Sequence, residues 1–370
     1  MTALRVYLSA GEPSGDRHAG ALARAISDAA PGAELEGMGG KEMASAGVAI
    51  THPSEQLSTR GLAEVAAQVP AHLRIARDLR RRFRQGAYDL VILVDYPGFH
   101  LRVAAAAREA GIPVLYYIAP QLWAWGAWRA ARLRASIDQL AVILPFEEPF
   151  FRTRGIPAKF VGHPLLEYRR SIEAASAREA LGAPAAGPLL GIFPGSRPAE
   201  IARHWPVFRD AARRVRRAVP EVAVVVAGID GVAYAGAEEF ILHRGDPALA
   251  FAAADAGLCK SGTTTLEAAL ADTPHVVAYK MHPLTYAAAR RVVRVPWIGL
   301  VNLVAGRTVS PELIQHGVTP QRLAESVLPL LDPAGSQARG QRVAFEQVRA
   351  ALGTPGAARR VAGLALDLAA

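Results

Sequence analysis

The chain has 370 residues and a formal net charge of +9, and 51% of its residues are hydrophobic while 20% are charged. This length and composition predict two globular domains and exclude long disordered stretches. The apolar runs are too short to cross a bilayer, and the single cysteine, Cys259, excludes an internal disulfide framework and an all-cysteine metal site.

The N-terminal sequence enters a strand-like run at residues 4–10 without a signal-peptide pattern, so we expect a cytoplasmic protein. The positive charge favours an anionic partner such as a phosphate or acidic lipid headgroups. No nucleic-acid-binding motif accompanies the arginine runs at 80–84 and 213–217, which we assign to solvated helix faces. We therefore expect no nucleic acid partner.

Apolar strand-like runs alternate with Ala-, Leu- and Arg-rich helical patterns through the first half of the chain. The predicted strands are 4–10, 34–37, 89–95, 113–118, 138–143 and 158–162. The predicted helices are 17–30, 61–84, 101–110, 127–135 and 147–154. Residues 171–188 have no strand character and are predicted to link two domains.

A second alternating series follows that linker. Its predicted strands are 188–193, 222–228, 239–242, 256–259 and 274–279. Its predicted helices are 199–218, 247–253, 263–271, 283–293, 311–316, 319–331, 336–352 and 356–369.

This alternation predicts an α/β fold of two Rossmann-like, doubly wound domains that face a central cleft. We place the first domain at residues 1–168 and the second at 169–345. A terminal helical segment, 346–370, can pack back on the first domain. In such sheets ligands bind at the carboxyl ends of the strands, so the loops there are the candidate site.

The loop after the first strand is Gly11-Glu12-Pro13-Ser14-Gly15-Asp16. It is neither a dinucleotide-binding glycine motif nor a P-loop. Ser14 or Asp16 can cap the following helix, whereas Glu12 is a carboxylate at a strand end with no capping duty. The alternative interpretation is a plain turn followed by a helix cap.

A second loop follows the five apolar residues at 90–94 and begins with Asp95. A carboxylate at the end of a buried strand can accept a proton from an attacking hydroxyl, so Asp95 is a candidate general base. The alternative is an acid that only holds the turn. His100 either orients Asp95 or simply lies at a helix start, and we favour the second interpretation.

The second domain carries two loops suited to a diphosphate. In the first, Gly195 and Ser196 allow close backbone approach and Arg197 offers a fork of donors to phosphate oxygens. A helix begins directly after this loop, which adds a favourable dipole for an anion. Glu200 on its first turn is expected to be structural.

The other loop runs from Lys260 to Glu267. Free amides of Ser261, Gly262 and Thr263 at a helix N-terminus make an anion site. Glu267 shares a helix face with Thr263 and can reach a ribose hydroxyl. The alternative is an ordinary N-cap and helix. No metal-binding spacing of His, Cys, Asp or Glu occurs, so no metal site is predicted.

Eight short motifs occur in an order that resembles the lipid-A-disaccharide synthase family, bacterial glycosyltransferases of the GT-B architecture. They are Ala10-Gly-Glu-Pro-Ser-Gly-Asp16, Asp95-Tyr-Pro-Gly-Phe-His-Leu-Arg102, Ala119-Pro-Gln-Leu-Trp-Ala-Trp125, Ile143-Leu-Pro-Phe-Glu147, Phe160-Val-Gly-His-Pro-Leu165, Pro194-Gly-Ser-Arg197, Ser261-Gly-Thr-Thr-Thr-Leu-Glu267 and Asn302-Leu-Val-Ala-Gly-Arg307. The series spans nearly the whole chain.

The resemblance implies an inverting transfer in which UDP-2,3-diacylglucosamine and 2,3-diacylglucosamine 1-phosphate (lipid X) give lipid A disaccharide 1-phosphate and UDP. It implies no cofactor and no required metal, and work at the inner face of the cytoplasmic membrane. Asp95 then takes the proton from the acceptor 6-hydroxyl, with Glu12 as the second candidate. The acceptor side also includes Ser14 and His100.

On the nucleotide-sugar side, the resemblance adds Asn302 and Arg307 to Arg197 and Glu267. Some positions depart from the family pattern. Gly98, Gly126 and Thr308 stand where other members often have an acid, an arginine and a glutamate, and residues 228–240 are short. The short segment leaves part of the wall of the nucleotide site undefined, and Gly98 removes an acid that could pair with Asp95.

The segment from Leu57 to Phe83, most of it in the predicted helix 61–84, is the candidate membrane contact. Leu62, Val65, Val69 and Leu73 recur at helical spacing, and arginines that include Arg80 and Arg81 crowd its C-terminal part. Apolar residues beside arginines are typical of an interfacial helix on anionic lipid. The alternative is a stripe that packs on the sheet.

Other functions are compatible with the same motifs. One is a different UDP-sugar enzyme of this architecture, with another glycolipid acceptor or as a UDP-GlcNAc epimerase. Another is a non-catalytic nucleotide-binding protein. The sequence leaves the oligomeric state and the acyl-chain preference open.

Overall fold

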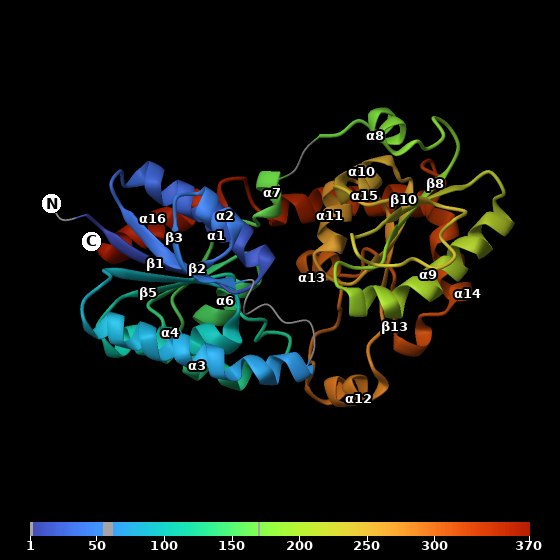
Figure 1. Cartoon of the computed structure of the whole chain (residues 1–370). Coiled ribbons are helices and arrows are strands. Elements are labelled where there is room, and N and C mark those ends of the chain that lie inside the picture. Colours follow the sequence, from blue (N-terminus) through green and yellow to red (C-terminus); the bar gives the residue numbers. More distant parts are fainter. Residues whose placement is uncertain (1–2, 55–61, 169–170) are drawn as a thin grey trace. The chain divides into compact units, whose positions relative to one another are not determined.

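The structure is a computed structural model that describes residues 3–54, 62–168 and 171–370, without the side chains of residues 62–68. The chain divides into two compact units (Figure 1). The first consists of Met1–Glu167 and Leu352–Ala370, and the second of Tyr168–Ala351.

The first unit is built on a seven-stranded sheet in the order β3-β2-β1-β4-β5-β6-β7. All neighbouring strands pair in parallel. The strands are β1 (Arg5–Ala10), β2 (Glu34–Gly39), β3 (Ala49–Pro53), β4 (Leu90–Val94), β5 (Val114–Tyr117), β6 (Gln139–Val142) and β7 (Ala158–Phe160). Every residue of β4 and β5 is buried, as expected for central parallel strands covered on both faces.

Helices cover both faces of this sheet. They are α1 (Pro13–Ala29), α2 (Lys41–Ser45), α3 (Leu62–Arg84), α4 (Pro97–Glu109), α5 (Ala130–Ser136), α6 (Glu147–Arg152) and α16 (Ala357–Ala369). The short helix α7 (Leu165–Tyr168) lies where the chain leaves the first unit for the second. One core contains residues of α1 and α16. The other contains residues of α3, α4, α5 and α6.

The second unit repeats the plan with six strands in the order β10-β9-β8-β11-β12-β13, all paired in parallel. The strands are β8 (Leu189–Phe193), β9 (Ala223–Ala227), β10 (Ile241–His243), β11 (Ala256–Lys260), β12 (His275–Tyr279) and β13 (Glu312–Ile314). Its helices are α8 (Ala174–Leu181), α9 (Pro198–Ala218), α10 (Pro247–Ala253), α11 (Thr264–Leu270), α12 (Pro283–Val292), α13 (Leu300–Ala305), α14 (Pro320–Val327) and α15 (Ser336–Ala351).

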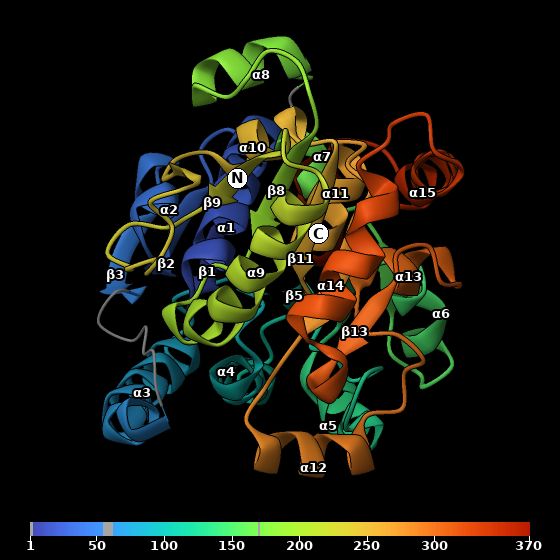
Figure 2. The ribbon, with the colours of Figure 1, turned by 90° about the vertical axis from the view of Figure 1, so that its right-hand side faces the viewer.

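Two helix layers again enclose the sheet (Figure 2). Residues of α9 and α14 fill one core, and residues of α8, α10 and α11 fill the other. The prediction of two doubly wound α/β domains is therefore confirmed.

The strand order reverses once in each sheet, between β1 and β4 and between β8 and β11. Loops that leave the carboxyl ends of two strands diverge at such a point, which is where doubly wound sheets bind ligands. The four loops selected from the sequence follow these four strands. The topology thus brings them together in two pairs, one pair in each unit.

Several elements differ from the sequence prediction. The sequence predicts a helix at 311–316, but 312–314 form the edge strand β13, because pairing with β12 outweighs local preference. The short β3, α2 and α13 are not predicted by the sequence pattern. The expected linker 171–188 contains α8, whose Ala177 and Leu181 are buried in a core of the second unit.

The C-terminal segment expected at 346–370 divides at Leu352. Helix α15 belongs to the second unit, whereas α16 belongs to the first, where Val361 and Ala365 are buried in the core that also holds residues of α1. Among the described residues, no helix is both long and apolar enough to span a membrane.

Candidate functional site

Asp95 follows the last residue of β4 and has a left-handed backbone, with φ of 52°. Tyr96 continues in the same region, with φ of 53°. Two successive non-glycine residues in this region are uncommon, and each costs on the order of 1 kcal/mol. Strain of this kind persists where the surroundings fix it, and it is typical of functional sites.

Two side chains fix the carbonyl oxygen of Asp95. The Tyr116 hydroxyl donates to it at 2.5 Å, and His100 Nδ1 lies 2.7 Å from it. Because a carbonyl oxygen only accepts, Nδ1 carries the proton, and Nε2 accepts from the Ser9 hydroxyl at 2.8 Å. These contacts hold the turn that carries the Asp95 carboxylate.

His100 is fully buried, and burial lowers its pKa to about 4. The sequence places it on the acceptor side and favours a plain position at a helix start. The structure instead binds its ring to the backbone of Asp95 and the side chain of Ser9, which favours an orienting role. Ser14, by contrast, is exposed on the first turn of α1.

Glu12 stands at the N-cap position of α1, where its side chain makes no capping hydrogen bond. Burial and then the negative charge of Glu12 raise the pKa of the Tyr96 phenol, so the Glu12 carboxylate lies near that ring. The Tyr96 hydroxyl is 2.9 Å from His72 Nε2 of α3. The loops after β1 and β4 are therefore adjacent, as the topology requires.

Asp16 does not cap its own helix. Its carboxylate accepts from the backbone amides of Gly40, Glu42 and Met43, at the start of α2. The aspartate of this motif thus joins α1 to α2, a role that depends on the tertiary fold.

In the second unit, the loop after β8 turns through Gly195, whose φ is +121°, and Arg197 is the N-cap residue of α9. Ser196 and Arg197 are exposed. Glu200, on the first turn of α9, pairs with Lys260 at 2.9 Å, and both side chains are largely buried. This ion pair ties the loop after β8 to the end of β11.

The loop after β11 differs in one respect from the expectation of three free amides. The Ser261 amide donates to the carbonyl of Ala278, and its hydroxyl donates to the carbonyl of Ile298. Among the described residues, the amides of Gly262 and Thr263 meet no protein acceptor. Two donors therefore remain for an anion at this loop.

Glu267 lies on α11 and is half-buried. Burial, and after it the charge of Glu267, raise the pKa of the Cys259 thiol, which places this carboxylate near the end of β11. Its backbone amide donates to the Thr263 carbonyl, so Glu267 lies next to the loop after β11.

Asn302 was expected to contact the nucleotide sugar, but the structure gives it a structural role. It is fully buried, and its amide group donates to the Ser310 carbonyl and to Glu312, both at 2.8 Å. Its oxygen accepts from the amides of Val309 and Ser310. Both donors and both lone pairs are used, so no hydrogen bond is left for a ligand.

We predict that Asn302→Ala lowers the free energy of unfolding by about 2–5 kcal/mol, because the buried amide of Ser310 and the partly buried amide of Val309 lose their acceptor. The measurement is denaturant unfolding of the variant against the unaltered protein. Its affinity for UDP, measured where the variant is folded, should stay close to the original value. Unchanged stability with lost UDP binding would restore Asn302 as a ligand.

In the part of the chain that the structure describes, no hydrogen bond or ion pair joins Arg307 to the loops after β8 and β11. Arg307 is exposed and donates to Gln347 of α15 at 3.0 Å. Thr308, one of the departures from the family pattern, accepts from the indole of Trp297.

The proposed membrane residues divide into three groups. The side chains of Leu62 and Val65 lie outside the described residues. Val69 is 45% exposed and Leu73 is 43% exposed, although they lie on a helix whose Leu79 is buried in the core. Two arginines are partly exposed in surface ion pairs, Arg80 with Glu109 and Arg81 with Asp78.

The sequence assigns no individual role to three residues that make specific contacts in the structure. Lys260 opens a motif but has no role that the sequence reveals, although it is one of only four lysines. Tyr116 lies inside an apolar strand with no distinguishing pattern. Glu147 is buried, where it binds the Trp123 indole and two backbone amides, and burial raises its pKa to about 7.

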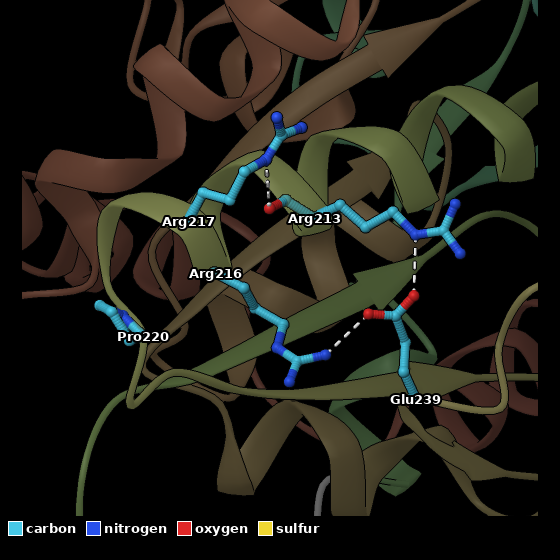
Figure 3. Close-up of a pocket in the computed structure, with 5 residues that line it drawn as sticks. All are labelled: Arg213, Arg216, Arg217, Pro220 and Glu239. Atoms are coloured by element: carbon cyan, nitrogen blue, oxygen red, sulfur yellow. Dashed lines mark hydrogen bonds and ion pairs between the residues drawn. The ribbon is translucent and has the colours of Figure 1, made fainter.

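A surface hollow of about 510 Å³ lies at the far end of α9, lined by Arg213, Arg216, Arg217, Pro220 and Glu239 (Figure 3). Glu239 pairs with Arg213 and Arg216, so much of the positive charge is neutralised within the protein. This hollow lies at the amino end of β9, whereas the candidate loops lie at the carboxyl ends of the strands. In the described part of the chain, no cluster of three or more His, Cys, Asp or Glu side chains could hold a metal ion.

The family model and the similar sequences found by comparison with known proteins agree with each other. Residues 6–361 match the family described as lipid-A-disaccharide synthetase. The lipid-A-disaccharide synthase of Anaeromyxobacter dehalogenans (strain 2CP-C) is 41% identical over 368 residues, covering 97% of this chain and 96% of the relative. That of Syntrophus aciditrophicus (strain SB) is 39% identical over 383 residues, covering 100% and 98%.

Solved structures share the fold at low sequence identity. The glycotransferase of kitacinnamycin superposes with a TM-score of 0.63 at 17% identity, over 100% of both chains. The UDP-GlcNAc 2-epimerase of Neisseria meningitidis bound to UDP-GlcNAc gives 0.61 at 12% identity, over 99% of this chain and 100% of that one. At these identities the likeness shows the fold alone.

Proposed function

The chain belongs to the lipid-A-disaccharide synthase family, and from that premise we propose how its own residues carry out the reaction. It is a glycosyltransferase that condenses UDP-2,3-diacylglucosamine with 2,3-diacylglucosamine 1-phosphate, giving lipid A disaccharide 1-phosphate and UDP. The family match decides against the epimerase and non-catalytic alternatives.

We propose that Asp95 is the general base. Inversion requires that the acceptor hydroxyl lose its proton as it attacks the face opposite the leaving UDP. The observation that carries this proposal is the strained turn at Asp95, held by Tyr116 and His100 through its carbonyl oxygen. A carboxylate held on such a turn needs little reorganisation to reach its reactive position. Glu12 is the second candidate, because its charge also acts at this turn.

The second unit supplies the groups that stabilise departing UDP in this proposal. Arg197 offers two parallel donors to a phosphate, and the amides of Gly262 and Thr263 offer two more. Lys260, fixed by its ion pair with Glu200, places ammonium donors next to the same loops, although Glu200 offsets its charge. Together they supply the charge stabilisation of a reaction that, we propose, requires no metal.

The direct test is incubation with both acylated substrates and detection of the disaccharide by mass spectrometry, with and without a chelator. Product that forms equally with chelator supports both parts of the proposal. Product that disappears with chelator contradicts the metal-independent part. A product only with an unacylated acceptor contradicts the substrate assignment.

The position of the Tyr96 ring depends on Gly11, and this gives a further prediction. A Cβ at Gly11 would lie 2.3–2.6 Å from three atoms of the Tyr96 ring, so the ring must move in Gly11→Ala. We expect kcat to fall by about tenfold or more, because the turn that carries Asp95 shifts with it. The matched control is Gly98→Ala, where a Cβ meets nothing within 4 Å and kcat should be unchanged.

We also propose that the protein acts at the inner face of the cytoplasmic membrane through α3. Val69 and Leu73 are exposed one turn apart, with arginines further along the helix. Apolar residues at this spacing can enter the headgroup region while the arginines meet anionic lipid. The stripe further along α3, including Leu79 and Phe83, packs on the sheet instead.

Vesicle sedimentation tests this placement. Binding should need anionic lipid, fall at high salt and weaken in Arg80→Glu/Arg81→Glu and in Val69→Ser/Leu73→Ser. Binding that ignores salt and both double changes would place the contact elsewhere.

A further inference from the structure

Helix α12 of the second unit has no buried residue. Leu284 is 76% exposed and Val292 is 54% exposed. In both ribbon views α12 stands off from the sheet of its own unit (Figures 1 and 2). A ten-residue helix is marginal in water by itself, so a helix without a buried residue is expected to be stabilised by a further contact.

Most side chains of α12 are exposed, and three apolar ones share a face. Leu284, Ala288 and Val292 follow one another at intervals of four residues and therefore line up along the helix. Arg291 lies seven residues after Leu284 and borders the same line, with Arg290 beside it. The face is thus an apolar stripe flanked by arginines, which is typical of helices that lie in a membrane interface.

The charge around α12 is of one sign. The sequence has no Asp or Glu between Asp272 and Glu312. Arg291 donates to the Ala287 carbonyl of its own helix, and Arg290 lies over the Tyr286 ring. Among the described residues, no carboxylate lies within ion-pair distance of Arg290 or Arg291. Arg80 and Arg81 of α3 are different, because both are paired.

We propose that α12 is a second membrane contact, which lies in the headgroup region of an anionic bilayer with Leu284 and Val292 inserted. The proposal rests on the proposed function, since a donor substrate with acyl chains brings the bilayer to the unit that binds its UDP group. Charge complementarity selects lipid as the occupant. Arg290 and Arg291, which have no carboxylate partner in the described part of the chain, match acidic headgroups, and the two large apolar side chains are about two helical turns apart rather than one compact patch.

The single native cysteine makes α12 easy to probe. Cys259 is buried, so a label reacts selectively with the thiol introduced by Leu284→Cys. An environment-sensitive fluorophore there should shift to the blue on vesicles of phosphatidylcholine with phosphatidylglycerol, and the shift should fall at high salt. The matched control is Val343→Cys on α15, a position 60% exposed in the same unit, which should show no shift.

Charge reversal provides the second arm. Arg290→Glu/Arg291→Glu should lower the vesicle partition coefficient by about tenfold or more at low salt. Arg339→Glu/Arg359→Glu makes the same change of net charge at exposed positions outside α12 and should have a smaller effect. A probe at 284 that does not respond while the protein sediments with anionic vesicles overturns the proposal. So does a shift that appears without lipid and grows with protein concentration, which would assign α12 to a contact between copies.

The two proposals fail in different ways. Disaccharide synthesis from substrates dispersed in detergent should be unchanged in the α12 variants. If the unaltered protein makes no disaccharide in detergent, the proposed function fails whatever α12 binds. If the unaltered protein makes disaccharide in detergent, and the α12 variants bind vesicles as well as the control variants do, only the α12 proposal fails.

Discussion

Asp95→Asn is expected to lower the rate of disaccharide synthesis by about a hundred- to ten-thousandfold, the usual effect of removing a positioned general base. The amide has nearly the shape of the carboxylate, and the backbone contacts from Tyr116 and His100 do not involve the side chain. The fold should therefore remain intact. The measurement is kcat with saturating substrates, together with thermal unfolding.

Two comparisons make the Asp95 result specific. Asp28→Asn, an exposed position on α1 of the same unit, should leave the rate unchanged. Glu12→Gln tests the second carboxylate. If Asp95→Asn keeps more than about a tenth of the rate, which corresponds to less than 1.4 kcal/mol of barrier, Asp95 is not the base. Glu12 then becomes the candidate, and a large loss in Glu12→Gln would support it.

Arg197→Ala is expected to weaken the affinity for UDP by about ten- to a hundredfold. Hydrogen bonds to charged groups contribute about 1.5–3 kcal/mol each, and each 1.4 kcal/mol is a factor of ten in affinity. Arg197→Lys should also weaken binding, because lysine retains the charge but lacks the planar pair of donors. Titration calorimetry with UDP measures both variants.

The control for Arg197 is Arg214→Ala, an exposed arginine on the same helix with no role in the proposed site. Its UDP affinity should match that of the unaltered protein. Unchanged affinity in both Arg197 variants would place this side chain outside the diphosphate site, and Lys260 would then be the next cation to test.

The sequence by itself determined the architecture and the loops that carry the site. Buried parallel strands such as 90–94 are continuous apolar runs, and the period of 3.6 marks the helices between them. Because ligand loops in doubly wound sheets follow strand ends, the residue pattern alone selects Glu12, Asp95, Arg197 and Glu267 as candidates. The motif series also identified the family, and the comparisons confirm it.

Only the tertiary structure decided which motif residues face a ligand and which support the fold. Asn302 belongs to a family motif, yet it is saturated by the backbone at 309–310 and by Glu312. Tyr116 has no motif of its own, yet it donates to the Asp95 carbonyl from the neighbouring strand. Hydrogen bonds of this kind join residues distant in the chain, and local residue patterns do not encode which donor meets which acceptor.

The same limit explains the elements and surfaces that were missed. The edge strand β13 exists because β12 offers it a partner, and its short sequence has no strand pattern strong enough to reveal it. The exposed faces of α3 and α12 depend on which side of each helix packs against the rest of the protein. A helical pattern in the sequence gives the spacing of apolar residues, but it does not show whether another segment covers them. The sequence therefore determined the periodicities and the strand-end chemistry. The packing of distant segments decided which side chains are buried, saturated or left exposed to bind something else.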